Sequence, residues 1–271
     1  MKKLVIINGV TGAIGSACLS LFASQKNTVV YGISRQARDF TEFCLEGKLP
    51  VATLICSLLK EMELWKAVDF FAKAIPADVF DEIYYIHAVG LYPFEIDSKG
   101  KRIVKYDYNK DGVDDRCEYL TFQMFRAFHH QISMRIKNKP LRSFLFGSLA
   151  DKHKPLAHTS WWKTLNKLRQ LSEFGPDLQG NISLLNISSV LCPNELITRP
   201  FVFISTDADS SYWLLPSEVA TYVDRLIRFH KPKVFFEDYE LFKKKPKFNQ
   251  DTYYQDEFFT PRKIAELFKK D

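Results

Sequence analysis

Short apolar runs alternate with amphipathic segments along most of the chain. The first run, Leu4 to Ile7, precedes a segment in which Ala17, Leu21 and Phe22 recur at helical spacing. Runs of both kinds then follow one another to about residue 240. This alternation predicts an α/β fold: a parallel sheet with helices on its faces and ligands at the carboxyl ends of its strands.

The pattern assigns each element to a stretch of sequence. Strands are expected at residues 4–7, 28–33, 50–56, 83–86, 141–146, 182–191 and 233–236. Helices are expected at residues 16–25, 59–75, 117–138, 161–174 and 217–229. In the last helix, Ser217 is the expected N-cap, with Pro216 just before it. No repeat or long linker divides the chain, so residues 1–271 are expected to form a single domain.

Three glycines, Gly9, Gly12 and Gly15, separate the first expected strand from its helix. Glycine in such a turn leaves room for a pyrophosphate and lets the helix begin close to the strand. The free N–H groups and the positive dipole end of that helix attract phosphates. The pattern predicts a dinucleotide site, and a purely structural glycine turn is the alternative.

The end of the second expected strand bears on the type of nucleotide. Ser34 and Arg35 stand there, with Arg38 close behind. In dinucleotide folds an acidic residue at this place binds the 2′-hydroxyl of the adenosine ribose, whereas a basic one favours a 2′-phosphate. Arg35 therefore favours NADP(H) over NAD(H); the alternative is that both arginines are ordinary surface residues.

Four segments, taken in order, carry a family resemblance. Residues 9–15 read GVTGAIG, residues 87–90 read HAVG, Ser148 follows the fifth expected strand, and residues 193–198 read PNELIT. They resemble the TGxxGxxG loop, the NNAG segment, the substrate-orienting serine and the PGxVxT segment of the short-chain dehydrogenase/reductase family. Asn8 stands where threonine is usual in that family, and Asn194 replaces a glycine. The resemblance implies a Rossmann-type doubly wound sheet of about seven strands.

The resemblance also implies roles for single residues. Ser148 would orient a substrate carbonyl or hydroxyl, and Lys163 would hold the ribose. His87, taken alone, is better explained as a packing histidine. The implied cofactor-binding residues are Gly9, Thr11, Gly12, Ile14, Gly15, Ser34, Arg35, Ala88, Val89, Gly90, Lys163, Pro193, Leu196 and Thr198.

The sequence departs from the family at its YxxxK motif. Residues 157–167 read AHTSWWKTLNK and contain no tyrosine. If Lys163 corresponds to the family's lysine, Thr159 stands in place of the tyrosine. If Lys167 corresponds to that lysine instead, Lys163 stands in place of the tyrosine. Threonine is too weak an acid for this task near neutral pH, whereas the imidazole of His158 titrates in the right range. The alternative is that the proton relay has been lost.

A charged segment at residues 97–118 interrupts the alternation and is expected to be an inserted acidic loop. Residues 107–118 satisfy the pattern D-x-[DN]-x-[DN]-G-x5-E and resemble an EF-hand calcium loop. Its calcium ligands would be Asp107, Asn109, Asp111, Val113 (through its carbonyl) and Glu118. Residues 105–106 look like a strand instead of an incoming helix, so a solvated acidic loop is the alternative.

Composition narrows the class of protein. The chain is 46% hydrophobic, which is typical of a globular protein, and its apolar runs are too short to span a membrane. Its five cysteines include no CxxC pair, which favours reduced thiols in the cytoplasm. Much of the net charge of +6 lies in residues 231–248, which are expected to be a solvated surface with no nucleic-acid partner.

Three functional hypotheses remain open on the sequence. The first is an NADP-dependent oxidoreductase acting on a carbonyl or hydroxyl of a small-molecule substrate. It is favoured because the residues at the cofactor positions largely match those of the family. The second, based on the missing tyrosine, is an NADP-binding sensor or partner protein without hydride transfer. The third is a protein that keeps the fold but has lost the cofactor. By analogy with the family, a homodimer or homotetramer is expected through residues 124–128 and 161–171.

Overall fold

The computed structural model describes residues 1–34, 54–55, 61–90, 95–96, 102–103, 110, 116, 119–136, 139–148, 180–187, 190 and 214–243. Within them, seven parallel strands form one sheet in the order β3-β2-β1-β4-β7-β8-β9. The strands are β1 (Lys3–Asn8), β2 (Thr28–Ser34), β3 (Leu54–Ile55), β4 (Glu82–His87), β7 (Leu141–Ser148), β8 (Asn181–Ile187) and β9 (Phe236–Leu241). An antiparallel pair, β5 (Glu95–Ile96) and β6 (Arg102–Ile103), comes from the segment around the predicted insertion.

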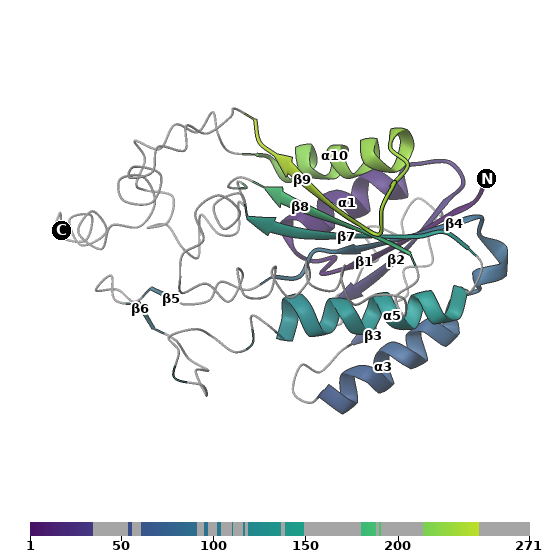
Figure 1. The fold of residues 1–271 in the computed structure, drawn as a ribbon, viewed down its shortest axis with the longest axis horizontal. Coiled ribbons are helices and arrows are strands. Elements are labelled where there is room, and N and C mark those ends of the chain that lie inside the picture. Colours follow the sequence, from purple (N-terminus) through teal and green to yellow (C-terminus); the bar gives the residue numbers. More distant parts are fainter. Residues whose placement is uncertain are drawn as a thin grey trace.

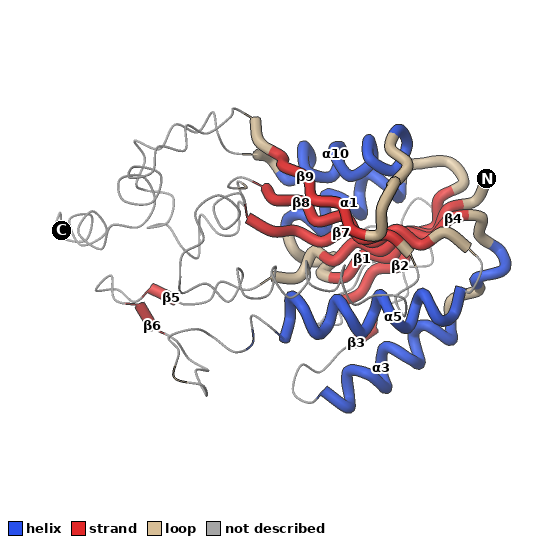
Figure 2. Tube along the Cα trace, viewed as in Figure 1, coloured by secondary structure: helices blue, strands red, loops and turns tan. Residues whose placement is uncertain are grey.

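Helices cover both faces of the sheet (Figure 1). On one face lie α1 (Ala13–Ala23) and α10 (Pro216–Phe229), and on the other lie α3 (Glu61–Ala74) and α5 (Met124–Ile136). Figure 2 shows the strands as a layer between these helices.

Each strand supplies side chains to two cores. In β1, Leu4 and Ile6 pack toward α3 and α5, whereas Val5 and Ile7 pack toward α1 and α10. All four side chains are buried, as expected for a parallel sheet covered on both faces. The predicted doubly wound α/β fold is confirmed.

The direction of strand order reverses between β1 and β4. From β1 the chain builds outward through β2 to β3 and then returns to place β4 on the other side of β1. Doubly wound folds bind ligands at such a switch point, outside the carboxyl ends of the strands. Asn8 and His87 are register partners at this edge, and Gly9 and Ala88 follow them directly.

Two predicted strands have wrong boundaries. The strand predicted at residues 233–236 instead spans Phe236–Leu241. Acidic side chains of β9 bond to Asn186 on β8 and pair with Arg142 on β7, and these long-range contacts leave no signal in the local sequence pattern. The strand predicted at residues 182–191 ends at Ile187, and Val190 makes only an isolated bridge. Of the strand predicted at residues 50–56, only Leu54–Ile55 is described.

Predicted helices differ as well, and the first of them begins at Ala13 instead of residue 16. Ser217 is not the N-cap of α10: Leu215 takes that place, and Pro216 becomes the first helical residue, where its missing N–H costs nothing. The Glu218 carboxylate accepts a bond of 2.7 Å from the Leu215 N–H. The helix predicted at residues 117–138 is divided into a π-helix, η2 (Tyr119–Gln123), and α5. The helix predicted at residues 161–174 lies outside the described residues, and among those described no helix is long and apolar enough to cross a membrane.

Candidate functional site

The turn between β1 and α1 is packed tightly against the end of β4. Gly9 has a positive φ of 84°, and its N–H donates to Ile33 O at 3.0 Å. A Cβ on Gly9 would lie 2.6 Å from Ala88 O, and a Cβ on Gly15 would lie 2.1 Å from Gly9 O. The fold itself therefore requires both glycines, because any side chain there would collide with the main chain.

Gly12 is under much weaker constraint from the fold. Its φ of −76° and ψ of 164° are open to any residue. Among the described residues, a Cβ there would contact only Gly9 O, at 3.3 Å, and Ala88 O, at 3.9 Å. The fold therefore gives little reason for a glycine at this position, whereas a phosphate bound close to the main chain requires a residue without a side chain here.

The first turn of α1 has no cap. Gly12, at the N-cap, has no side chain, no side chain in the described part of the chain caps the helix, and the first turn holds no acidic residue. The first intrahelical bond joins Ser16 N–H to Gly12 O at 2.8 Å. The N–H groups of Ala13, Ile14 and Gly15 therefore have no acceptor within the helix. These donors and the positive end of the helix dipole suit an anion.

Neighbouring strand ends complete this edge of the sheet. Thr11 Oγ1 lies 3.5 Å from Ser34 Oγ at the end of β2. On the other side of the turn, Ala88 N–H donates to Asn8 O at 2.8 Å, and Val89 and Gly90 follow in the chain. The structure thus brings together the residues of β1, β2 and β4 that the sequence analysis assigned to the cofactor, apart from Arg35.

The His87 side chain is buried and bonded at both ring nitrogens. Nε2 lies 2.9 Å from Leu120 O, which can only accept, so Nε2 carries the proton. Nδ1 then accepts from the Tyr85 hydroxyl at 2.8 Å, and Asn8 Nδ2 lies 3.4 Å from both of these atoms. Burial lowers the pKa of His87 to about 4, and the bond to Leu120 O opposes this shift. The ring is neutral and fully engaged, in agreement with a packing role.

Acid is expected to destabilise the protein through His87. An unfolded histidine titrates near pH 6.5 and the folded His87 near pH 4, so the unfolded state binds the additional proton between these values. The free energy of unfolding should be fully retained above pH 6.5 and fall by on the order of 3 kcal/mol by pH 4. Urea denaturation from pH 7 to pH 4 would measure this. His87→Gln lacks the titrating group, and an equally steep fall in that variant would contradict the assignment.

The π-helix η2 adds a group that the sequence analysis missed. Thr121 is 1% exposed, and its hydroxyl has no hydrogen-bond partner in the described part of the chain. An unpaired buried hydroxyl is costly, and π turns are frequent at functional sites. The neighbouring Leu120 O accepts from His87, so η2 begins beside the carboxyl end of β4. Helical periodicity could not reveal this local change of winding.

The remaining candidate residues are only partly described. Ser148 is the last residue of β7, so it lies at the same carboxyl edge of the sheet as the glycine turn. Outside the described residues lie Arg35, His158, Thr159, Lys163, Lys167, Pro193, Leu196 and Thr198, as well as Asp107, Asn109, Asp111, Val113 and Glu118. In the ranges that the structure does describe, no three His, Cys, Asp or Glu side chains form a group that could hold a metal ion.

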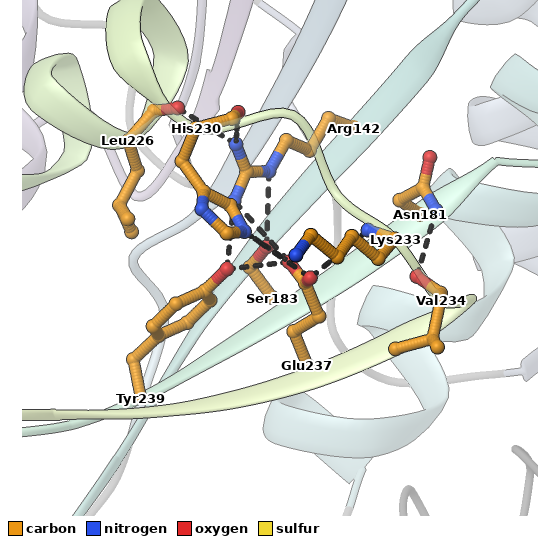
Figure 3. Close-up of polar contacts among 9 residues, drawn as sticks. All are labelled: Arg142, Asn181, Ser183, Leu226, His230, Lys233, Val234, Glu237 and Tyr239. Carbon is orange, nitrogen blue, oxygen red and sulfur yellow. Dashed lines mark hydrogen bonds and ion pairs between the residues drawn. The ribbon is translucent and has the colours of Figure 1, made fainter.

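A buried charged cluster lies near the starts of β7, β8 and β9, at the opposite, amino-terminal edge of the sheet, and Figure 3 shows its side chains. Its centre is Arg142, the second residue of β7, which is 5% exposed. The guanidinium donates to Ser183 Oγ (3.0 Å), to the carbonyls of Leu226 and His230 (both 2.8 Å) and to the Tyr239 hydroxyl (3.3 Å), and it lies 3.7 Å from the Glu237 carboxylate. Burial lowers the pKa of Arg142, while Tyr239 and Glu237 oppose this shift. The cluster joins α10 to three strands.

Known proteins resemble this chain in structure but not in sequence. No model of a protein family matches the sequence, and no curated protein matches it either. L-sorbose reductase from Gluconobacter frateurii, complexed with NADPH and L-sorbose, matches with a TM-score of 0.63 at 12% identity, over 89% of this chain and 95% of the reductase. The chain has the fold of this oxidoreductase.

Two further solved structures share the fold. Alcohol dehydrogenase from the archaeon Thermococcus sibiricus, complexed with 5-hydroxy-NADP, has a TM-score of 0.61 at 14% identity, over 92% of this chain and all of the other. A mutant short-chain dehydrogenase/reductase from Serratia marcescens has a TM-score of 0.62 at 12% identity, over 88% of this chain and 96% of the other. At such low identity the likeness concerns the fold, and the activity has to be argued from the site.

Proposed function

We propose that the chain binds NADP(H) at the turn between β1 and α1 and is an oxidoreductase of the short-chain dehydrogenase/reductase type. The observation that carries this proposal is the uncapped start of α1 at the β1–β4 switch point, where Gly12 leaves the main chain bare. Two structures of the same fold that contain NADPH or 5-hydroxy-NADP support it. The substrate would be a small molecule with a carbonyl or hydroxyl group.

The proposed cofactor contacts come from three strand ends. The N–H groups of Ile14 and Gly15 would hold the pyrophosphate, and Ser34 and Arg35 would receive the 2′-phosphate. The main chain of residues 88–90 would line the cofactor at the same carboxyl edge of the sheet. In the segment that begins at Pro193, the main chain of Leu196 would contact the nicotinamide carboxamide and Thr198 would face the pyrophosphate, as the family resemblance implies.

The chemistry would take place at the end of β7. Bound NADPH would supply a hydride to a carbonyl carbon, while Ser148 orients the carbonyl oxygen and Lys163 holds the ribose. His158 is the proposed proton donor to that oxygen because imidazole is the side-chain group suited to proton transfer near neutral pH; Thr159 or a water is the alternative.

A second function is favoured by the absence of tyrosine from residues 157–167. The protein would then bind NADP(H) as a sensor or partner protein without hydride transfer. Oxidation of NADPH with a panel of aldehydes, ketones and ketoses separates the two functions. Turnover that depends on Lys163 supports the enzyme, whereas tight NADPH binding without any turnover supports the sensor. The calcium site at residues 107–118 and the homodimer or homotetramer stay predictions from the sequence.

Substitution of Gly12 tests the cofactor site with little effect on folding. Gly12→Asp would place a carboxylate at the N-cap of α1, where it would accept bonds from the free N–H groups and repel phosphate. NADPH affinity, measured by fluorescence titration, is expected to fall about 100-fold or more. The melting temperature should equal or exceed that of the wild type, because aspartate is a better N-cap than glycine. Gly12→Asn is the neutral matched control and should lose less affinity. Wild-type affinity in Gly12→Asp would overturn the proposed site.

A further inference from the structure

A chain of buried hydrogen bonds runs from the π-helix to the proposed cofactor turn. Leu120 O accepts from His87 Nε2, and His87 Nδ1 accepts from the Tyr85 hydroxyl. Asn8 Nδ2 lies 3.4 Å from both the Tyr85 hydroxyl and His87 Nδ1. Asn8 immediately precedes Gly9, and its carbonyl accepts from Ala88 N–H. All three polar side chains, from Asn8, Tyr85 and His87, are at most 4% exposed.

The two ends of this series of hydrogen bonds belong to helices on opposite faces of the sheet. The π-helix leads into α5, whereas the glycine turn leads into α1 (Figure 1). The central sheet separates these helices, so a link between their starts has to pass through the strand ends. Phe125, in the first turn of α5, packs its ring 5.7 Å from that of His87 and 5.9 Å from that of Tyr85.

We propose that His87 is a positioning residue for the cofactor site, which keeps the π-helix and the glycine turn in a fixed relation. This inference rests on the proposed NADP(H) site. One tautomer and one ring orientation satisfy both Leu120 O and the Tyr85 hydroxyl, so the neutral ring acts as a rigid spacer. A turn that is already ordered loses less freedom when it binds a ligand, and its affinity is higher for that reason.

Two substitutions of His87 distinguish the effects of the hydrogen bonds made by its two ring nitrogens. In His87→Gln the longer amide can still donate to Leu120 O, whereas the shorter amide of His87→Asn reaches only the position of Nδ1. We expect His87→Asn to raise the Kd for NADPH about 10-fold and His87→Gln to raise it less than about 3-fold. Hydrogen exchange at the amides of Gly9, Gly12 and Ala88 should be faster in His87→Asn than in His87→Gln.

Phe125→Leu is the control for a general loss of stability. It removes packing against His87 and Tyr85 but no hydrogen bond, so its melting temperature should fall while the Kd for NADPH stays at the wild-type value. If His87→Asn does not fold, Tyr85→Phe interrupts the same chain with an isosteric ring. That variant should raise the Kd about 3-fold and accelerate exchange at the same amides.

The outcomes distinguish this inference from the proposed function. If the wild-type protein binds NADPH and His87→Asn binds it equally well, or if Phe125→Leu loses as much affinity, the positioning role is wrong. If the wild-type protein does not bind NADPH, the proposed function is wrong, and amide exchange then decides the positioning role. Equal exchange in His87→Asn and His87→Gln would overturn it, whereas faster exchange in His87→Asn alone would support it.

Discussion

Replacing Gly15 with alanine is expected to destabilise the protein by about 3 kcal/mol or more, enough to prevent folding if the wild type is only marginally stable. The new Cβ would lie 2.1 Å from Gly9 O and 2.8 Å from Gly9 C. Gly9 has little room to move, because its N–H is bonded to Ile33 O and even a Cβ added to it would collide with the main chain of Ala88. Urea denaturation, or the yield of soluble protein if the variant does not fold, would measure the loss.

Gly12→Ala is the control for this substitution. The new Cβ would lie 3.3 Å from Gly9 O, a contact that a shift of a few tenths of an ångström relieves, so the expected loss is below about 1 kcal/mol. Similar stabilities for Gly15→Ala and the wild type would mean that α1 does not pack on the glycine turn as described. The pair therefore separates the glycine that the fold needs from the glycine assigned to the cofactor.

Replacing Arg142 with methionine is expected to cost about 3–5 kcal/mol, because one partner of a buried ionic network is removed and the others remain. The carbonyls of Leu226 and His230 would lose their donor, and Glu237 would lose the guanidinium that lies 3.7 Å from its carboxylate. Urea denaturation at pH 7 checks the value. NADPH affinity of the folded variant should be unchanged, since the cluster lies near the edge of the sheet opposite the glycine turn.

A second substitution isolates the charge from the packing. The double variant with Arg142→Met and Glu237→Gln removes the uncompensated carboxylate and should recover part of the lost stability. Glu237→Gln alone should destabilise the protein, because Arg142 would lose its carboxylate and Tyr239 a charged acceptor. Additive losses in the double variant would show that Arg142 and Glu237 do not interact.

The features that the sequence predicted correctly have local signals. The apolar run of β1, the three glycines and α1 are adjacent in the chain, and their spacing alone indicates strand, turn and helix, although α1 begins at Ala13, three residues before the predicted start. The parallel sheet with helices on its faces follows from repetition of the same alternation, and its doubly wound order of about seven strands is what the family resemblance implied. His87 could be assigned to packing because a histidine taken alone is more often a packing residue than a functional one.

The features that the sequence did not predict depend on distant partners. In the sequence, Arg142 is an ordinary charged residue, and only the structure shows that β9 and the end of α10 surround it. The acidic segment of β9 likewise forms a strand through its pairing with β8. The carbonyl of Leu120 in the π-helix accepts a hydrogen bond from His87, which lies 33 residues earlier in the chain. Such long-range bonds leave no periodicity in the sequence. The candidate residues from 158 to 198 belong to a part of the chain that the structure does not describe, so their roles rest on the resemblance.

The pairing of β1 with β4 has a consequence for synthesis on the ribosome. Asn8 and His87 are neighbours in the sheet but 79 residues apart in the chain. At a translation rate of about 5–20 residues per second, the apolar β1 must wait several seconds before this partner emerges. During that interval β2 can pair with only one side of β1, so the other side of this apolar strand stays unpaired on the nascent chain, where it is prone to aggregation unless a chaperone covers it.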